Sequence, residues 1–557
     1  MYHPLFWCCP NTPTVDQSYG HDVDLAGDVP GPFALAVDPA QQYKAKELKI
    51  CSFARPHMRA FHYSWWSFFI AFFIWFSIAP LLPEVKISLQ LTGQQIWISN
   101  IVAVSGDIVM RFVFGSLTDQ FGARVLMGGV LMAASIPTAC TGLVNSLTGL
   151  CFLRLFIGCA GSTFVMCQCW STRMFTKEIV GTAKYVVENE ILLMSCIVFL
   201  YCIVLLLYYC MSHIFFILAF FSRWTYFEQH SALVGGWGNV GGGVTQIVMG
   251  TLLYPLFRDV VYGGLDDPDD PTVAAIASDK AWRTVCVIPA IVAFTTGMIV
   301  IATSEDCPEG NYKQLIKEGK MMPVSASASL RQGAININTW LLYIQYGCCF
   351  GVELTMNNAA ASYFVDKFDL NIASASAIAS IFGFMNIFAR GLGGWSSDKM
   401  NDRMGMRGRI WTQLILLLLE GICIIVFALM NSLWAAILLL TIFSIFVQGA
   451  EGSTYGIVPY VNTQAPGAVS GIVGAGGPSG AVAFGMGFLF LERTHAYFLM
   501  GGLVILSSLS CLLINIKNHG GILTPPPDAS TAQPAITLEV PVADVDDAKR
   551  LNEDEEL

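Results

Sequence analysis

Two arginines lie inside stretches of apolar sequence that are long enough to cross a membrane. Arg111 falls within residues 97–117 and Arg390 within residues 372–392. Arginine keeps its charge in proteins, and inserting it at the centre of a membrane costs at least ~2.5–3.5 kcal/mol. Its guanidinium group can donate two parallel hydrogen bonds to a flat oxyanion. The two residues therefore indicate a buried binding site for a small anion.

Acidic residues in the same stretches leave a second interpretation open. Asp107 precedes Arg111 by four residues, so the two side chains share one face of a helix and can form an ion pair. Glu353 also lies inside an apolar stretch. Arginines paired only with such carboxylates would be structural. Asp107 and Glu353 are also the candidates for proton coupling, with structural hydrogen bonding as the alternative.

Glycine is concentrated in the apolar stretch 232–250. Each glycine costs roughly 1 kcal/mol relative to alanine in a water-exposed helix, but in a membrane glycines let two backbones approach closely. Asn239 and Gln246 in the same stretch cannot face lipid cheaply. We therefore predict a closely packed, sliding helix that directs an amide into the protein. Its glycines, and those of a similar stretch near residue 478, are Gly235, Gly236, Gly238, Gly241, Gly242, Gly243, Gly476, Gly477 and Gly480.

The elements that carry these residues are predicted to be membrane-spanning helices. Of 557 residues, 54% are hydrophobic and only 13% are charged, whereas soluble domains usually carry about 25% charged residues. An all-α membrane protein is therefore the expected fold class. Twelve apolar runs come near the ~17–25 residues that span a bilayer. They lie at 65–82, 97–117, 125–143, 149–170, 232–256, 285–303, 341–364, 372–392, 410–429, 433–449, 469–491 and 496–514.

The composition also argues against several functions. The net charge is −10 and no basic patch offers a nucleic-acid surface. The 17 cysteines are scattered through apolar runs without the spacing of metal ligands. No constellation of residues indicates catalysis. We therefore expect no nucleic acid, metal or cofactor, and no enzyme.

The twelve runs form two groups of six that repeat a pattern. Arg111 and Arg390 are 279 residues apart (390 − 111), and an aspartate follows each arginine by eight residues. The glycine pairs at 238–241 and 477–480 are 239 residues apart (477 − 238). The first half therefore carries 40 extra residues between these landmarks. Two repeated halves are typical of secondary transporters.

An apolar insertion in the first half accounts for the difference in spacing. It is either a re-entrant or surface-lying helix or a translated intron in an erroneous gene model. The second is favoured because the segment has no small-residue or polar pattern that suggests packing. The predicted division is a cytoplasmic tail 1–60, a first half 61–303 with the insertion 184–230, a cytoplasmic linker 304–338, a second half 339–516 and a disordered acidic cytoplasmic tail 517–557.

The loops predict the orientation in the membrane. In a twelve-span arrangement the basic clusters of the N-terminal tail, the linker and the short loops fall on one side, which by the positive-inside rule is the cytoplasm. The acidic loop 266–270 falls on the other side. One extra crossing by the insertion would invert the second half. Both termini are therefore expected in the cytoplasm.

A charged loop motif occurs twice in register. It follows the second and eighth spans and resembles the loop motif of the major facilitator superfamily, with an ordinary charged turn at the membrane edge as the alternative. Glycines allow a tight turn, and the aspartate can cap a helix or pair with arginine. The residues that match are Gly115, Asp119, Gly122 and Arg124 in the first copy and Gly394, Asp398 and Arg403 in the second.

Further motifs resemble the nitrate/nitrite porter branch of that superfamily, especially its eukaryotic high-affinity members. The resemblance extends from residue 61 to about residue 514, apart from the insertion. It implies the major facilitator fold, in which a pseudo-twofold axis relates two six-helix halves. The matching stretches are 61–69, 163–170, 235–246, 350–354, 388–394, 455–462 and 471–480.

The resemblance assigns roles to individual residues. It implies anion contacts from Arg111 and Arg390, an amide from Asn239, and aromatic walls from Phe164 and from Tyr343 or Tyr346. The glycine stretches would supply the packing and gating contacts. This chain departs from the family where Pro478 replaces an asparagine, which removes an amide and a backbone donor.

The implied activity is uptake of nitrate, and also of nitrite, by proton symport through alternating access in the plasma membrane. The partners would be the anion, protons and the lipid bilayer, and the resemblance leaves room for an accessory membrane subunit. Two alternatives remain. The chain could carry another small anion, or it could sense nitrate without net transport.

Overall fold

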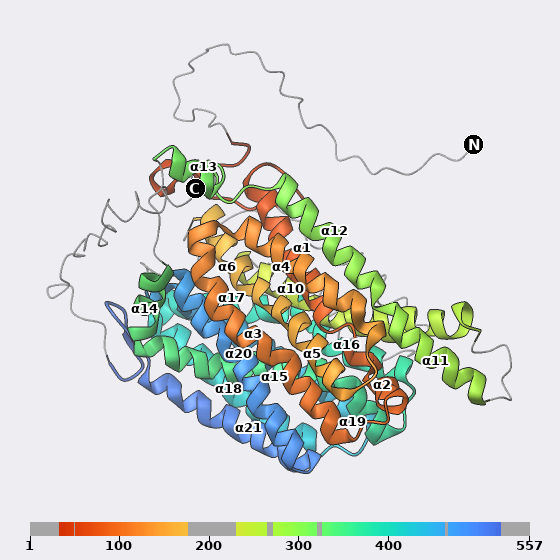
Figure 1. Ribbon diagram of the computed structural model, residues 1–557. Coiled ribbons are helices and arrows are strands. Elements are labelled where there is room, and N and C mark those ends of the chain that lie inside the picture. Colours follow the sequence, from red (N-terminus) through yellow and green to blue (C-terminus); the bar gives the residue numbers. More distant parts are fainter. Residues whose placement is uncertain are drawn as a thin grey trace, which may run out of the picture.

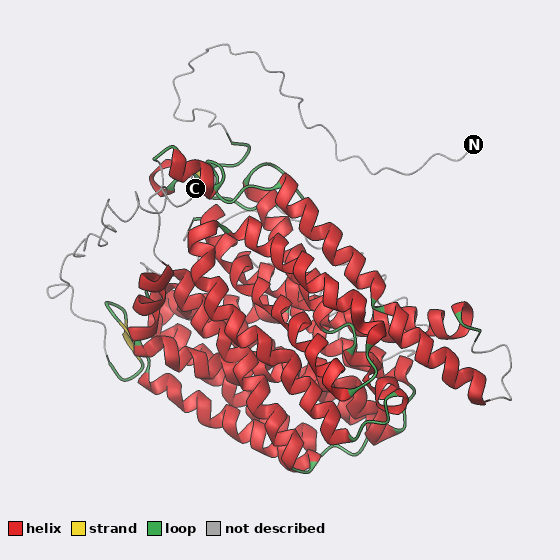
Figure 2. Cartoon of the chain, in the orientation of Figure 1, coloured by secondary structure: helices red, strands yellow, loops and turns green. Residues whose placement is uncertain are grey.

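The computed structural model describes residues 33–49, 51–176, 230–263, 271–319, 326–462 and 466–524. Helices make up nearly all of this part of the chain, as Figure 2 shows. Two short antiparallel pairs of strands occur outside the bundle, β1 (Val37–Asp38) with β2 (Lys44–Ala45) and β3 (Asn515–Ile516) with β4 (Gly520–Gly521). The helices lie side by side in one slanted bundle (Figure 1).

The first half contains the helices that precede residue 304. They are α1 (His57–Trp75), α2 (Leu82–Ser88), α3 (Gly93–Phe121), α4 (Ala123–Ala139), α5 (Leu147–Gly158), α6 (Thr163–Met174), α10 (His230–Thr245), α11 (Pro271–Val285) and α12 (Val287–Thr303). Short 3₁₀ turns connect some of them: η1 (Pro39–Gln41), η2 (Ala79–Leu81), η3 (Cys140–Leu143) and η4 (Cys159–Ser162). The π-helical segments η5 (Gln246–Leu253) and η6 (Leu256–Val261) extend α10.

The linker and the second half also consist of helices and short 3₁₀ turns. The linker contains α13 (Tyr312–Lys317) and α14 (Ala326–Ile335). The second half contains α15 (Ile337–Phe368), α16 (Ile372–Phe384), α17 (Ala389–Met404), α18 (Met406–Ala428), α19 (Leu433–Ile457), α20 (Pro466–Phe490) and α21 (Arg493–Leu509). Its 3₁₀ turns are η7 (Met385–Ile387), η8 (Val458–Tyr460) and η9 (Ser510–Leu513).

The described residues contain eleven helical segments that are long and apolar enough to cross a membrane. They correspond to all the predicted spans except the seventh, 341–364. Helix α15 covers that range and has 32 residues, which is ample length, but it is more polar. Gln345, Glu353 and Asn357 on α15 are all buried. The seventh span therefore lies among other helices, where protein rather than lipid surrounds its polar side chains.

The insertion 184–230 lies almost wholly outside the described residues. The structure describes the chain up to residue 176 and again from His230, where α10 begins. The tails 1–32 and 525–557 also lie outside the described ranges. Helix α20 lies within the described range 466–524 and continues through Pro478 as one helix from Pro466 to Phe490.

The two glycine stretches make matching contacts in the two halves. Helix α10 packs on α1, and helix α20 packs on α15. A Cβ atom added at Gly238 would meet the ring of Phe68 on α1, and one added at Gly477 would meet the ring of Phe350 on α15. Gly241 and Gly480 approach backbone on the same two helices. The repeat in sequence is therefore a repeat of helix packing.

The halves also touch each other through glycine. Gly243 on α10 lies against α16, where an added Cβ would be 2.8 Å from the amide nitrogen of Phe384 and 2.8 Å from the carbonyl oxygen of Ser380. On α3, a Cβ at Gly115 would lie 3.2 Å from the Cα of Gly471 on α20. These close approaches need residues without side chains.

We expect Gly243→Ala to destabilise the protein by roughly 1–3 kcal/mol, because the methyl group would push α10 away from the backbone of α16. Gly129→Ala is the matched control, since a Cβ at Gly129 meets nothing within 4 Å. Thermal unfolding of the purified variants would measure the difference. Equal unfolding temperatures for the two variants would contradict the packing described here.

Candidate functional site

Arg111 and Arg390 meet at the ring of Phe164. The guanidinium carbon of Arg111 lies 5.1 Å from the centre of this ring, and that of Arg390 lies 5.3 Å from it. The two groups are therefore no more than about 10.4 Å apart, the sum of these distances. Helices α3, α6 and α17 supply the three side chains. All three are at most 1% exposed.

Arg111 has a partner on each side of its guanidinium group. Its Nε donates to Oδ2 of Asp107 at 2.7 Å, one turn earlier on α3. Nη1 donates to the carbonyl oxygen of Gly474 at 2.9 Å, and Nη2 donates to that of Gly161 at 3.1 Å. Gly474 belongs to α20, so Arg111 connects the two halves of the protein. The ion pair with Asp107 that the spacing predicts is present.

Among the described residues, the ion-pair and hydrogen-bond partners of Arg390 lie in the second half. Its Nη1 forms an ion pair with Glu451 of α19, and Nη2 donates to the hydroxyl oxygen of Tyr346 at 3.0 Å. A Cβ at Gly235 would lie 3.0 Å from Nε of Arg390. The glycine stretch of α10 therefore reaches the second arginine directly.

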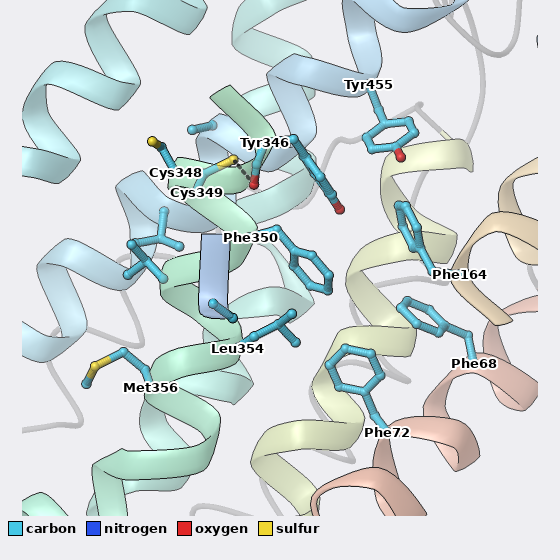
Figure 3. Close-up of a cluster of buried hydrophobic side chains, with 14 of the residues drawn as sticks. Phe68, Phe72, Phe164, Tyr346, Cys348, Cys349, Phe350, Leu354, Met356 and Tyr455 are labelled. Carbon is cyan, nitrogen blue, oxygen red and sulfur yellow. Dashed lines mark hydrogen bonds between the residues drawn. The ribbon is translucent and has the colours of Figure 1, made fainter. Parts of the chain in front are cut away.

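Aromatic rings from both halves, among them Phe164, Tyr346, Phe350 and Tyr455, lie close together in the core (Figure 3). The ring of Phe164 lies 6.1 Å from the ring of Tyr346 and 6.1 Å from that of Phe350, and both pairs are stacked. Tyr455 meets Phe164 edge-on at 5.1 Å. Arg111 also lies over Phe350, at 5.1 Å. The π faces of aromatic rings attract guanidinium groups, so these rings help to hold both arginines in place.

Buried carboxyl groups form a cluster beside Arg390. Oε1 of Glu353 accepts a hydrogen bond of 3.0 Å from the side-chain amide of Asn386. The amide of Asn239 donates to Glu451 at 3.4 Å. The remaining oxygen of each carboxyl group, Oε2 of Glu353 and Oε1 of Glu451, has no hydrogen-bond partner among the described residues.

The predicted wall residue Tyr343 lies away from this cluster. Its hydroxyl group donates to Oγ of Ser479 at 2.6 Å, and its ring contacts Trp340. Of the two tyrosines that the resemblance suggests, Tyr346 is the one at the arginines. Tyr343 instead faces α20, where a Cβ added at Gly476 would meet the carbonyl group of Tyr343.

The first copy of the loop motif lies at one end of α3, where the charged residues are paired. Asp119 lies 3.7 Å from Arg173, and Arg124 lies 3.6 Å from Asp306. Gly122 has a φ of +86°, and a side chain there would collide with Asp306. Burial raises the pKa of Asp306, and its bonds to Arg124 oppose this shift. These contacts connect α3 and α4 to the segment after α12.

In the second copy, Asp398 pairs with Arg409 of α18 at 2.5 Å. Arg403 is exposed. The aspartate of each copy therefore contacts an arginine, but the residue that supplies this arginine is not one that the sequence motif contains.

Sequence reasoning missed three buried ionisable residues. Glu451 contacts Arg390, Glu420 on α18 is fully buried, and Arg154 on α5 is 2% exposed. Neither carboxyl oxygen of Glu420 has a hydrogen-bond partner among the described residues. The signal that identifies Arg111, a charged residue inside an apolar run, applies equally to these three positions. No group of three metal-ligating side chains occurs in the described ranges.

Comparisons with known proteins agree with the architecture. A family model described as Major Facilitator Superfamily matches residues 64–184. A crystal structure of a bacterial homologue of the human lysosomal transporter Spinster, inward-facing and unoccupied, has a TM-score of 0.52. It is 14% identical, and the match covers 82% of this chain and 95% of that chain. At this identity the likeness concerns the fold alone.

Curated relatives are more similar in sequence. High affinity nitrate transporter 2.5 of Arabidopsis thaliana is 32% identical over 89% of this chain and 87% of its own length. High-affinity nitrate transporter 2.3 of Oryza sativa subsp. japonica is also 32% identical, over 92% of this chain and 87% of its own. The nitrate/nitrite transporter NrtP of Picosynechococcus is 26% identical over 78% of this chain and 85% of its own. The chain therefore belongs to the high-affinity nitrate transporter family of the major facilitator superfamily.

Proposed function

We propose that this protein carries nitrate, and also nitrite, across the membrane by binding the anion between Arg111 and Arg390. The observation that carries the proposal is the convergence of these two buried arginines on Phe164, from equivalent positions in the two halves. A flat monovalent oxyanion suits these residues. A guanidinium group has five donors, of which the contacts described above use three on Arg111 and two on Arg390, and Phe164 offers a flat wall. The names of the relatives supply the substrate.

Movement would come from the interfaces between the halves. Arg111 contacts α20 through Gly474, and Gly243 contacts α16. Contacts made of backbone and glycine can slide without disturbing interlocked side chains. In our proposal the halves rock about the bound anion, so that it is open first to one side and then to the other. Both termini lie in the cytoplasm in this arrangement, and the membrane is the plasma membrane.

The charges at the site support coupling to protons. Two arginines and three carboxyl groups (Asp107, Glu353 and Glu451) give the site a formal charge of −1 when all are ionised, and a bound anion would make it −2. Two protons on the carboxyl groups raise the empty site to +1, which one anion neutralises. Like charges buried together are unfavourable. The anion and about two protons therefore bind best together.

Within this scheme the acidic residues have separate tasks. Asp107 is held by Arg111 at 2.7 Å and orients it. Glu451 pairs with Arg390 and accepts a hydrogen bond from Asn239, and Glu353 accepts one from Asn386. We assign proton binding to these two glutamates. Inward movement of an anion against an inside-negative potential costs ~2.3 kcal/mol per 100 mV, which symported protons would supply.

Uptake of ¹⁵N-nitrate by cells that lack their own nitrate transporters would test the function. We expect saturable uptake that increases as the external pH falls and that nitrite inhibits. Phosphate and small carboxylates should not compete, whereas strong competition by them would favour a carrier of another anion. Surface-expressed protein without uptake or current would favour a sensor, and recovery of uptake on co-expression of an accessory subunit would restore the proposal.

A further inference from the structure

A second group of residues suited to an anion lies at the end of the bundle opposite the loop motifs. A cavity of about 250 Å³ opens there among α2, the start of α3, the end of α15 and the adjoining ends of α20 and α21. Lys86, Asn100, Ser362, Asp366 and Arg493 contribute polar groups to its wall. Arg493 is paired with Asp366 at 2.8 Å.

Arg154 lies immediately behind this wall. Its Nη1 donates to Oδ1 of Asn100 and to Oγ of Ser99, both at 2.7 Å on α3. Its Nη2 donates to Oδ1 of Asn358 on α15 at 2.8 Å. The guanidinium group therefore contacts both halves of the protein, and one of its partners, Asn100, forms part of the cavity surface.

The charge of Arg154 is not balanced as those of the central arginines are. Arg111 pairs with Asp107 and Arg390 with Glu451. No carboxylate among the described residues lies within ion-pair distance of Arg154, and its buried Nε has no hydrogen-bond partner there. A guanidinium group has five donors, and the three bonds above leave two. A buried cation with free donors is costly, and a small anion would satisfy it.

The same two helices connect this position to the central site. Asn100 precedes Arg111 on α3 by eleven residues, which is ~16 Å along a helix. Asn358 follows Phe350 on α15 by eight residues, or ~12 Å. An anion at Arg154 would therefore bind at a position separate from Phe164, beside the cavity that Asn100 lines.

We propose that Arg154, with Asn100, Ser99 and Asn358, forms a second binding site that takes small monovalent anions from the cavity before they reach Arg111 and Arg390. The order in which the anion visits the two sites rests on the proposed function. The existence of the second site depends only on whether an anion binds at Arg154. Two donors of the guanidinium group remain for an ion, and the cavity of about 250 Å³ that Asn100 lines can admit nitrate, nitrite or chloride.

Equilibrium dialysis of the purified full chain against ¹⁵N-nitrate would test the proposal. We expect two bound anions per wild-type chain and one in the double variant Arg111→Gln/Arg390→Gln. Adding Arg154→Gln should remove the remaining one, whereas Arg154→Lys in the same background should retain it. A parallel dialysis with labelled chloride identifies the ion. A folded double variant that binds neither anion would overturn the second site, and this outcome is independent of whether the wild type transports nitrate.

A second measurement avoids substituting Arg154 itself. Ser362 lines the cavity one helical turn after Asn358. In the variant Ser362→Cys, we expect a negatively charged thiol reagent to react several-fold faster than a positively charged one. When Ser362→Cys is combined with Arg111→Gln/Arg390→Gln, we expect nitrate to slow the reaction at this cysteine. Lys86→Gln should reduce the preference for the negative reagent. Equal rates for both reagents and no protection by nitrate would show that Arg154 only joins the two halves.

Discussion

Arg111→Gln and Arg390→Gln are each expected to lower nitrate uptake to the background of cells without the protein. Glutamine is too short and too weakly polar to give the two charge-assisted hydrogen bonds that the anion requires. Each substitution also removes the partner of a buried carboxylate, Asp107 or Glu451, which costs about 3–5 kcal/mol in comparable ion pairs. Uptake of ¹⁵N-nitrate, normalised to protein at the cell surface, measures the effect.

A paired substitution separates loss of the site from loss of the fold. Arg111→Gln/Asp107→Asn removes both members of the ion pair, so no uncompensated carboxylate remains. We expect it to regain thermal stability relative to Arg111→Gln without regaining uptake. Arg258→Gln is the control for arginine removal in general, since Arg258 is partly exposed and pairs with its neighbour Asp259. Normal uptake by a surface-expressed Arg111→Gln/Arg390→Gln double variant would refute the central site.

The second large effect is expected from Glu451→Gln, which mimics a permanently protonated carboxyl group beside Arg390. The anion should still bind and exchange, because the favourable charge of the protonated site is retained. Proton-driven accumulation should be lost. Without coupling, a monovalent anion at −100 mV equilibrates about 50-fold lower inside than outside, as ~2.3 kcal/mol corresponds to that ratio.

Proteoliposomes with an imposed pH gradient and membrane potential would distinguish the two properties. We expect Glu451→Gln to show nitrate counterflow at a rate near that of the wild type, but no concentrative uptake. Glu420→Gln is the matched control, because Glu420 is an equally buried carboxyl group in the second half with no hydrogen bond to Arg390. Concentrative uptake by Glu451→Gln would remove this residue from the coupling pair.

The positions of the spanning helices could be predicted because they depend on local composition. A run of about 20 apolar residues has few alternatives to a membrane helix, and eleven of the twelve predicted ranges meet this description. Helix α15 is the one predicted span that composition alone does not identify among the described residues. Its Glu353 and Asn357 look unfavourable for a span when only composition is considered, and burial against other helices makes them acceptable.

The repeat also carried information about packing. Gly238 and Gly477 match in sequence, and in the structure they lie against equivalent phenylalanines of α1 and α15. Glycine in a membrane helix has a narrow use, which is close approach, so its pattern predicts contact. It does not name the partner, which depends on how the whole helix is oriented.

The sequence by itself determined the fold class and the family. It also singled out Arg111 and Arg390 as candidates, because a charged residue in a long apolar run is anomalous wherever the chain folds. The tertiary structure alone decided which side chains share the site. Glu451 follows Arg390 by 61 residues, and Phe164 and Arg390 come from different halves. Tyr346 rather than Tyr343 contacts Arg390, because Tyr343 lies ~4.5 Å away along the helix axis and ~60° around it, where Ser479 is its partner. The contacts of Arg154 with α3 and α15 depend on how the helices cross, and spacing along the chain does not encode that geometry.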